Sequence, residues 1–209
     1  MLKIFENDDF LVIKKNIHID FHGENGLLEQ LRAEYRQLFG IHRLDKETSG
    51  LMVFAKNKQV QSDISRLFED RLVTKYYLAL ARQKPKKKMG SIIGDLEKGR
   101  GGSYYLKSTK LNPSQTIFTH KNLPESKLRL FILKPKTGKT HQLRVVMKSL
   151  GAPIIGDERY SKIESDRMYL HAFKLSFRYK QESYNFLSYP LDGDLFNTKG
   201  MQDLSLIHI

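Results

Sequence analysis

The chain has 209 residues and carries 36 Lys and Arg against 23 Asp and Glu, which gives a net charge of +13. Its length suits one sizeable hydrophobic core, and a hydrophobic share of 40% excludes a disordered chain. The absence of cysteine excludes disulfides and thiolate metal sites. The apolar runs are too short to cross a bilayer and the acidic start has no signal-peptide pattern, so we expect a cytoplasmic protein without a membrane partner.

The excess of basic residues indicates an anionic partner. A basic face that serves only solubility is the alternative, but an excess this large in so short a chain favours nucleic acid. An anionic membrane surface is less favoured, because the sequence contains no long basic amphipathic helix.

Hydrophobic periodicity divides the chain into strand-like and helix-like segments. In chain order, the predicted elements are a strand at residues 10–14, a helix at 26–39, a strand at 51–56, a helix to about residue 70, strands at 73–81, 116–120 and 127–134, a short helix that follows Thr140, and strands at 167–179 and 184–189. Asn57 is the expected N-cap of the second helix, and Gly151 is expected to end the third.

Strands outnumber helices and do not alternate with them regularly. This pattern predicts an α+β fold with a mixed, mainly antiparallel β-sheet flanked by helices and loops. Residues 82–103 are basic and rich in glycine, and we interpret them as a loop and short hairpin inserted in one domain that covers residues 1–209. The tail at residues 201–209 has no clear role.

A polar turn with one acid between basic residues precedes the strand at 51–56. Its sequence is His42-Arg43-Leu44-Asp45-Lys46-Glu47-Thr48-Ser49-Gly50. Taken alone, Asp45 is more often a turn residue that pairs with Arg43 or Lys46. The alternative is a carboxylate nucleophile or general base exposed in a basic cleft.

A second polar segment suggests an anion-binding loop at the start of a helix. It reads Lys136-Thr137-Gly138-Lys139-Thr140-His141-Gln142-Leu143-Arg144, and it lacks the first glycine of a P-loop. Arg144 either extends along the apolar helix face into water or reaches a buried carboxylate.

Aromatic and histidine side chains are further candidates. Tyr76 and Tyr77 are adjacent on a strand and therefore point to opposite faces, so that one of them can stack on a base. His42, His141 and His171 have no metal-binding spacing, which favours structural roles over a metal site.

Together, these segments resemble the RluA family of pseudouridine synthases. The matching motifs are His42-Arg43-Leu44-Asp45 with Thr48-Ser49-Gly50-Leu51, Lys75-Tyr76-Tyr77-Leu78-Ala79-Leu80, Thr137-Gly138-Lys139-Thr140-His141-Gln142-Leu143-Arg144-Val145, Leu150-Gly151-Ala152-Pro153-Ile154-Ile155-Gly156-Asp157 and Leu170-His171-Ala172. The likeness extends from about residue 4 to about residue 190. It implies a short stand-alone catalytic domain, because no S4-type RNA-binding domain fits in front of it.

The resemblance also implies roles for individual residues. Asp45 corresponds to the catalytic aspartate, Tyr77 to the active-site tyrosine and Arg144 to the basic partner of the aspartate. Leu170 corresponds to an apolar residue that packs against the target base, and Arg43 to a residue that helps to hold the place of the flipped nucleotide. The other substrate-binding candidates are His42, Thr48, Lys139, His141 and Gln142. Lys139 and Val146 depart from the family's usual Arg and His.

The activity implied by the resemblance is the isomerisation of a uridine in structured ribosomal or transfer RNA. One carboxylate is enough to break the N1–C1′ bond because uracil leaves as a delocalised anion, so no metal and no cofactor are expected. Attack of Asp45 on C1′ and a glycal route through the C2′ proton are both open. The uridine has to leave the RNA stack, and the predicted phosphate contacts are Lys84, Lys86, Lys87, Lys88 and Arg100.

Two other functions compete with this one. A non-catalytic RNA-binding or ribosome-assembly protein on the same fold explains the charge but not the joint occurrence of Asp45, Tyr77 and Arg144. A metal-dependent nuclease would instead use Asp45, His42 and His141. The sequence indicates no obligate protein partner, so we expect a monomer.

Overall fold

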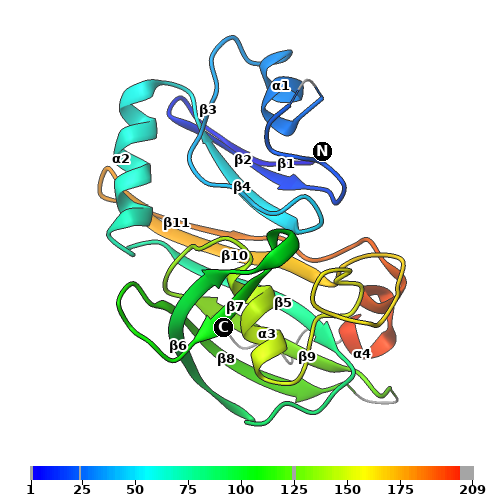
Figure 1. The fold of residues 1–209 in the computed structure, drawn as a ribbon. Helices are drawn as coiled ribbons and strands as arrows, with labels where there is room; N and C mark the ends of the chain where they lie inside the picture. The colour runs from blue at the N-terminus through cyan, green and yellow to red at the C-terminus, as the bar shows by residue number, and fades with distance from the viewer. Residues whose placement is uncertain (1, 24, 124–125, 203–209) are drawn as a thin grey trace. The chain divides into compact units, whose positions relative to one another are not determined.

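The computed structural model describes residues 2–23, 25–123 and 126–202 (Figure 1). The chain folds into two compact units. Unit 1 comprises Met1–Lys75 and His171–Tyr189, and unit 2 comprises Tyr76–Leu170 and Pro190–Ile209. Within the described ranges, no helix is both long enough and apolar enough to cross a membrane.

Unit 1 is built on a sheet with the strand order β1-β2-β4-β10, in which β3 also pairs with β4 and β11 with β10. The strands are β1 (Leu2–Glu6), β2 (Phe10–Lys15), β3 (Phe39–Gly40), β4 (Ser49–Ala55), β10 (Leu170–Tyr179) and β11 (Glu182–Leu187). β4 and β10 run parallel, and the other pairings described for this unit are antiparallel.

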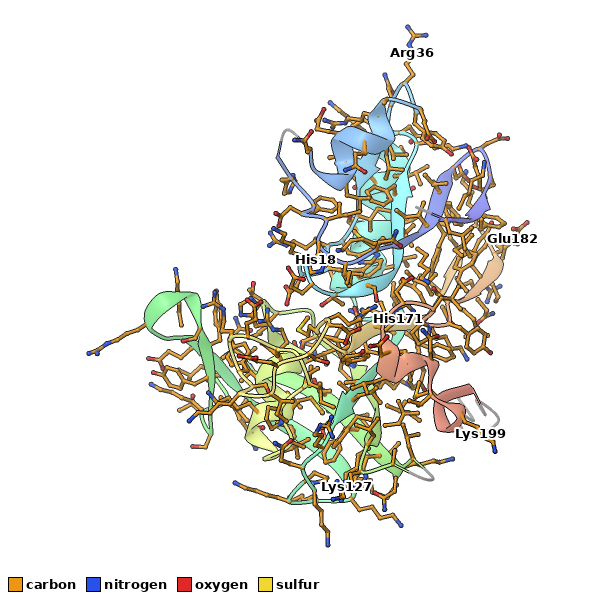
Figure 2. The ribbon with its side chains drawn as sticks, turned by 90° about the vertical axis from the view of Figure 1, so that its right-hand side faces the viewer. His18, Arg36, Lys127, His171, Glu182 and Lys199 are labelled. Carbon is orange, nitrogen blue, oxygen red and sulfur yellow. The ribbon has the colours of Figure 1, made fainter. Side chains whose placement is uncertain are left out.

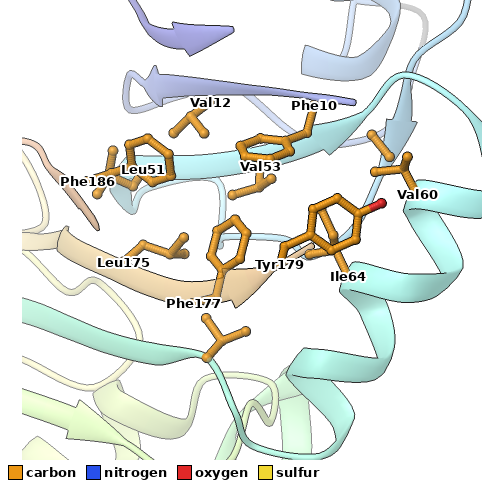
Figure 3. Packing of buried hydrophobic residues seen from close by; sticks show 12 residues of the cluster. Phe10, Val12, Leu51, Val53, Val60, Ile64, Leu175, Phe177, Tyr179 and Phe186 are labelled. Carbon is orange, nitrogen blue, oxygen red and sulfur yellow. The ribbon is translucent and has the colours of Figure 1, made fainter. Parts of the chain in front are cut away.

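The core of unit 1 lies between the apolar side chains of β2, β4 and β10 and those of α2 (Lys58–Glu69). Figure 3 shows Phe177 of β10 facing Val53 of β4. The rings of Phe10 and Phe177 lie 5.6 Å apart, and Ile64 of α2 is fully buried beside them. This burial explains why β2 and β4 read as continuous apolar runs rather than as alternating strands.

The second predicted helix is confirmed, whereas the first is much shorter than predicted. The Asn57 side chain accepts a hydrogen bond from the Val60 amide at 2.9 Å, as expected of an N-cap. Of the helix predicted at residues 26–39, only α1 (Leu27–Arg32) is helical in the structure. It ends early because Phe39 pairs with Ala55 in the sheet and the Tyr35 hydroxyl donates to Glu6, so tertiary contacts outweigh helical periodicity.

Unit 2 contains an antiparallel sheet with the strand order β5-β9-β8-β6-β7. The strands are β5 (Thr74–Ala81), β6 (Met89–Lys98), β7 (Tyr104–Lys107), β8 (Ser114–Asn122) and β9 (Arg129–Pro135). Figure 1 shows α3 (Gln142–Ser149) lying across these strands. The predicted end of this helix is confirmed, because Gly151 adopts φ +74° directly after the C-cap Leu150.

Residues 82–103 contain more regular structure than a loop and a short hairpin. They contain the ten-residue strand β6, which pairs with β8 and also forms a hairpin with β7 across η1 (Arg100–Gly102). Gly94 lies inside the strand, where a Cβ would collide with the Lys107 carbonyl. The glycine therefore marks a close approach of two strands rather than a loop.

The predicted α+β class with mainly antiparallel pairing is confirmed. A single domain over residues 1–209 stays a prediction. The chain after Tyr189 forms η2 (Asp194–Asn197) and α4 (Lys199–Gln202). The predicted tail at 201–209 begins in α4, and residues 203–209 lie outside the described part of the chain.

We expect Asn57→Ala to lower the free energy of unfolding by about 1 kcal/mol, because the Val60 amide loses its acceptor at the start of α2. Chemical denaturation measures this change. Asn57→Asp keeps an acceptor oxygen and serves as the control. Equal stability of the Ala and Asp variants would contradict the capping role.

Candidate active site

The residues predicted for the site fall into two sets, one in each unit. Unit 1 holds His42, Arg43, Asp45 and Thr48, and unit 2 holds Tyr77, Lys139, His141, Gln142, Arg144 and Leu170. In unit 1 the set lies on one polar turn, and in unit 2 four of its members lie in the loop before α3 or at the start of that helix.

The turn of unit 1 holds Asp45 in a defined position. The Asp45 carbonyl accepts a hydrogen bond from the Thr48 amide at 3.0 Å. Leu44 and Thr48 are buried on either side, whereas Asp45 is partly exposed and Arg43 is exposed. The backbone is therefore anchored while the carboxylate-bearing residue keeps access to solvent.

A buried lysine supports this turn from beneath. Lys15 is fully buried, and its ammonium group donates to the carbonyls of Asn16, Ile19 and Lys46 at 2.8–3.0 Å. The Lys46 carbonyl directly follows Asp45, so the ammonium group fixes the backbone at the candidate carboxylate. Sequence reasoning missed this role, although a lysine that ends the apolar strand β2 is a usable signal.

The exit of the turn is fixed where β4 meets β10. His171, a residue of β10, is labelled in Figure 2. The Ser49 hydroxyl lies 2.7 Å from His171 Nδ1, and His171 Nε2 lies 2.8 Å from the Ser188 carbonyl. Because a carbonyl only accepts, His171 carries its proton on Nε2 and accepts the Ser49 proton at Nδ1. Gly50 has φ +117°, and a Cβ there would collide with the Ala172 backbone.

His42 fixes the entry of the same turn. Its ring stacks on Phe68 at 4.7 Å, and its Nε2 accepts a hydrogen bond from the Val53 amide at 3.1 Å. Burial, followed by the charge of Lys75, lowers the pKa of His42 from 6.5 to about 3. These contacts give His42 a structural role, and its role in substrate binding stays a prediction.

In unit 2 the two tyrosines of β5 divide between the faces of the sheet. Tyr77 is partly buried opposite Leu133 of β9. The Tyr76 ring lies 5.0 Å from the Lys134 ammonium group. Adjacent residues of a strand point to opposite faces, so Tyr77 lies on the face of the sheet opposite to Tyr76 and its contact with Lys134. Leu170 is buried in the same unit.

The loop before α3 is shaped by Gln142. Its side-chain oxygen accepts from the Thr137 hydroxyl at 2.7 Å and from the Lys139 amide at 3.0 Å. Its side-chain nitrogen donates to the Gln115 carbonyl and the Thr116 hydroxyl. Gln142 thus holds the loop in shape, and direct contacts of Gln142 and Lys139 with substrate stay predictions.

The Arg144 guanidinium group reaches a buried carboxylate, which was one of the two alternatives left by the sequence. Nε and Nη2 each donate to an Asp157 carboxylate oxygen at 2.8 Å, and both residues are buried. The pair joins two N–H groups of the guanidinium group to the two oxygens of one carboxylate, which fixes the orientation of Arg144. Pairing of Arg144 with Asp45 stays a prediction.

Sequence reasoning assigned no role to Asp157 or to Tyr160. Asp157 Oδ1 also accepts from the Arg159 and Tyr160 amides, which closes a turn over residues 157–160. The available signal was the Gly156-Asp157 pair in a matching motif, with a tyrosine three residues later. Gly156 is required there because a Cβ would overlap the Arg167 backbone.

The metal-dependent alternative needs a cluster of ligating side chains. Among the residues that the structure describes, no group of three or more His, Cys, Asp or Glu side chains is arranged to hold a metal ion. The histidines proposed for that alternative are instead engaged in hydrogen bonds with protein groups.

Comparisons with known proteins give a consistent result. A family model described as RNA pseudouridylate synthase matches residues 9–149. The chain is 46% identical over 200 residues to an "Uncharacterized RNA pseudouridine synthase" of Haemophilus influenzae, which covers 92% of the chain and 89% of that protein. It is 35% identical over 194 residues to the dual-specificity RNA pseudouridine synthase RluA of Vibrio parahaemolyticus, covering 83% and 76%. The solved structure of human RNA Pseudouridylate Synthase Domain Containing 1 matches with a TM-score of 0.77 at 30% identity, covering 90% of this chain and 82% of that chain.

We expect Lys15→Met to lower the free energy of unfolding by about 2–4 kcal/mol, because three buried carbonyls lose a charged donor. Thermal and chemical unfolding measure the change. Lys46→Ala is the matched control, since it removes an exposed side chain from the turn and keeps the Lys46 carbonyl. Similar stability of the two variants would refute the supporting role of Lys15.

His42 is expected to make stability depend on pH. Its folded-state pKa of about 3 lies below the ordinary value of 6.5, so the unfolded chain binds the proton first. The contribution of neutral His42 to stability is complete above pH 6.5 and is lost as the pH falls toward 3, by at most about 1.4 kcal/mol per pH unit. Unfolding titrations of wild type and His42→Gln should show a steeper acid loss in the wild type; parallel curves would count against this assignment.

Proposed function

Because the chain belongs to the RNA pseudouridylate synthase family and isomerises uridine in RNA to pseudouridine, we propose that Asp45 is the carboxylate that carries this reaction. The predicted resemblance to the RluA family is confirmed by the family model and by the relatives. The observation that supports Asp45 is that its turn is anchored while Asp45 stays partly exposed. The Lys15 ammonium group holds the turn at the Lys46 carbonyl, and the Ser49–His171 contact holds it where β4 begins.

The chemistry follows from the bond that has to break. The electron pair of the N1–C1′ bond leaves with uracil, which spreads the negative charge over its ring and carbonyl oxygens. In one route the carboxylate of Asp45 forms a bond to C1′, and after the base has turned, C5 joins C1′ and the bond to Asp45 breaks, which releases the carboxylate. In the other route Asp45 helps to remove the C2′ proton, and that proton returns to C2′ as C5 of the turned base joins C1′. Loss of the C5 proton and protonation of N1 complete an isomerisation without net oxidation.

The other members of the site are assigned supporting roles. Arg144, oriented by Asp157, is assigned as the basic partner of the Asp45 carboxylate. Tyr77 stacks on the uracil and its phenol moves a proton at C5, while Leu170 packs against the base. Arg43 is exposed and contacts the RNA beside the flipped uridine.

The substrate is assigned by class. The net charge of +13 supports a structured RNA held by phosphate contacts. We place the uridine in ribosomal or transfer RNA, as the resemblance to the RluA family implies. We also propose that the protein is cytoplasmic, because a chain without cysteine needs no oxidising compartment. We propose that it acts as a monomer.

Asp45→Asn is expected to lower the rate of pseudouridine formation by about a thousandfold or more, while RNA binding persists because the phosphate contacts are unchanged. Pseudouridine-specific sequencing of treated ribosomal and transfer RNA, and gel-shift titration, measure the two quantities. Glu47→Gln neutralises a neighbouring acid of the same turn and is the control.

Retained activity in Asp45→Asn would refute the assigned carboxylate. If neither wild type nor variant modified RNA that both bind, a purely RNA-binding role would follow. EDTA should leave wild-type activity and RNA length unchanged, and RNA cleavage that EDTA abolishes would establish the nuclease alternative.

A further inference from the structure

Tyr160 joins three parts of unit 2 that the proposed mechanism does not connect. Its hydroxyl accepts a hydrogen bond from the Tyr104 amide of β7 at 2.7 Å and lies 2.9 Å from Nδ1 of His141, which precedes α3. The Arg144 guanidinium carbon lies 5.1 Å from the centre of its ring. Tyr160 is buried, so these contacts are formed away from solvent.

The hydrogen-bond pattern favours one direction for the phenol proton. An amide can only donate, so the Tyr104 contact uses an acceptor position of the phenol oxygen and leaves its proton for another partner. Of the two hydrogen-bond contacts described for this hydroxyl, the one with Nδ1 of His141 is the one that can accept the proton. Burial raises the pKa of Tyr160 above its usual 10.0, which keeps that proton in place at neutral pH. In this arrangement the neutral His141 ring carries its own proton on Nε2.

The backbone of His141 shows that this ring is held in a selected orientation. His141 has φ +55°, in the left-handed region that residues other than glycine rarely occupy. Its ring meets the Tyr104 and Tyr160 rings edge-on, at 5.5 Å and 5.7 Å. Strain of this kind persists where the surroundings determine the conformation, and it is concentrated at functional sites.

A second contact ties the same hairpin to the same turn. Arg159 Nη1 donates to the Gly101 carbonyl at the tip of the β6–β7 hairpin. The tip carries Arg100, which is exposed and was predicted to contact phosphate. The turn over residues 157–160 thus binds the hairpin through Tyr160 and Arg159, and it binds Arg144 through Asp157.

We propose that Tyr160 is a positioning residue, which sets His141 as an Nε2–H donor toward an acceptor oxygen of the bound RNA and ties the β6–β7 hairpin to the start of α3. This inference rests on the proposed function and deepens it, because it assigns the alignment of the RNA to a residue that does not touch the reacting atoms. Tyr160 acts through His141 and the hairpin, whereas Asp157 orients Arg144 by hydrogen bonds.

The tautomer of His141 provides a test that does not depend on activity. In the wild-type protein, ¹⁵N-resolved NMR of the histidine rings should show Nδ1 unprotonated and Nε2 protonated for His141. Tyr160→Phe keeps the ring beneath Arg144 and removes only the hydroxyl, so His141 should change to a mixture of tautomers. His171, which Ser49 and the Ser188 carbonyl fix, is the internal control and should not change.

Kinetics test the link to RNA. Tyr160→Phe should raise KM about five- to tenfold, the effect of one lost hydrogen bond, while kcat at saturating RNA stays within about twofold. In a His141→Asn background, which tolerates the left-handed backbone, the same substitution should raise KM by no more than about twofold.

Three results would overturn the proposal: a wild-type His141 protonated on Nδ1, an unchanged tautomer in Tyr160→Phe, or a loss confined to kcat. The wild-type spectrum alone decides the first, even if the variant does not fold. Failure of the Asp45 assignment is recognised separately, because retained activity in Asp45→Asn leaves the tautomer and KM results unaffected.

Discussion

The buried carboxylate of Asp157 is the constraint on which the arrangement of unit 2 depends. A buried charge is strongly unfavourable unless it is paired and its lone pairs are satisfied, and Asp157 meets both conditions with Arg144 and two backbone amides. The same contacts that make its burial possible also set the direction of the guanidinium group and close the turn that carries Tyr160. The buried Asp157 carboxylate therefore influences both the orientation of Arg144 in α3 and the contacts of Tyr160 with the β6–β7 hairpin.

In unit 1 a buried group of the opposite charge, the Lys15 ammonium group, has the same function. Lys15 places an ammonium group where three carbonyls converge, and one of these carbonyls belongs to the residue after Asp45. In both units, a fully bonded buried ion fixes a polar turn whose neighbouring side chains stay accessible. Because the Lys15 ammonium group binds the backbone of the turn at the Lys46 carbonyl, Asp45 remains partly exposed while the backbone beside it is held in place.

Features that depend on short-range interactions were predicted more accurately than those that depend on distant segments. The N-cap of α2 and the end of α3 were predicted correctly, because Asn57 and Gly151 act on backbone groups a few residues away. The helix predicted at residues 26–39 was too long, because its last residue belongs to β3. This strand pairs with β4, a segment later in the chain, and hydrophobic periodicity does not detect such a pairing. The extent of β6 was not predicted for the same reason, because the strand that crowds Gly94 comes later in the chain.

The sequence by itself determined the α+β class, the family and the residues to examine, because motifs and hydrophobic patterns are local properties of the chain. It named Arg144 but not the contact of Arg144 with Asp157, and it gave no role to Lys15, Asp157 or Tyr160. Only the tertiary structure decided these points, since whether a polar side chain is buried, and which carbonyl or carboxylate meets it there, depends on segments that folding brings together.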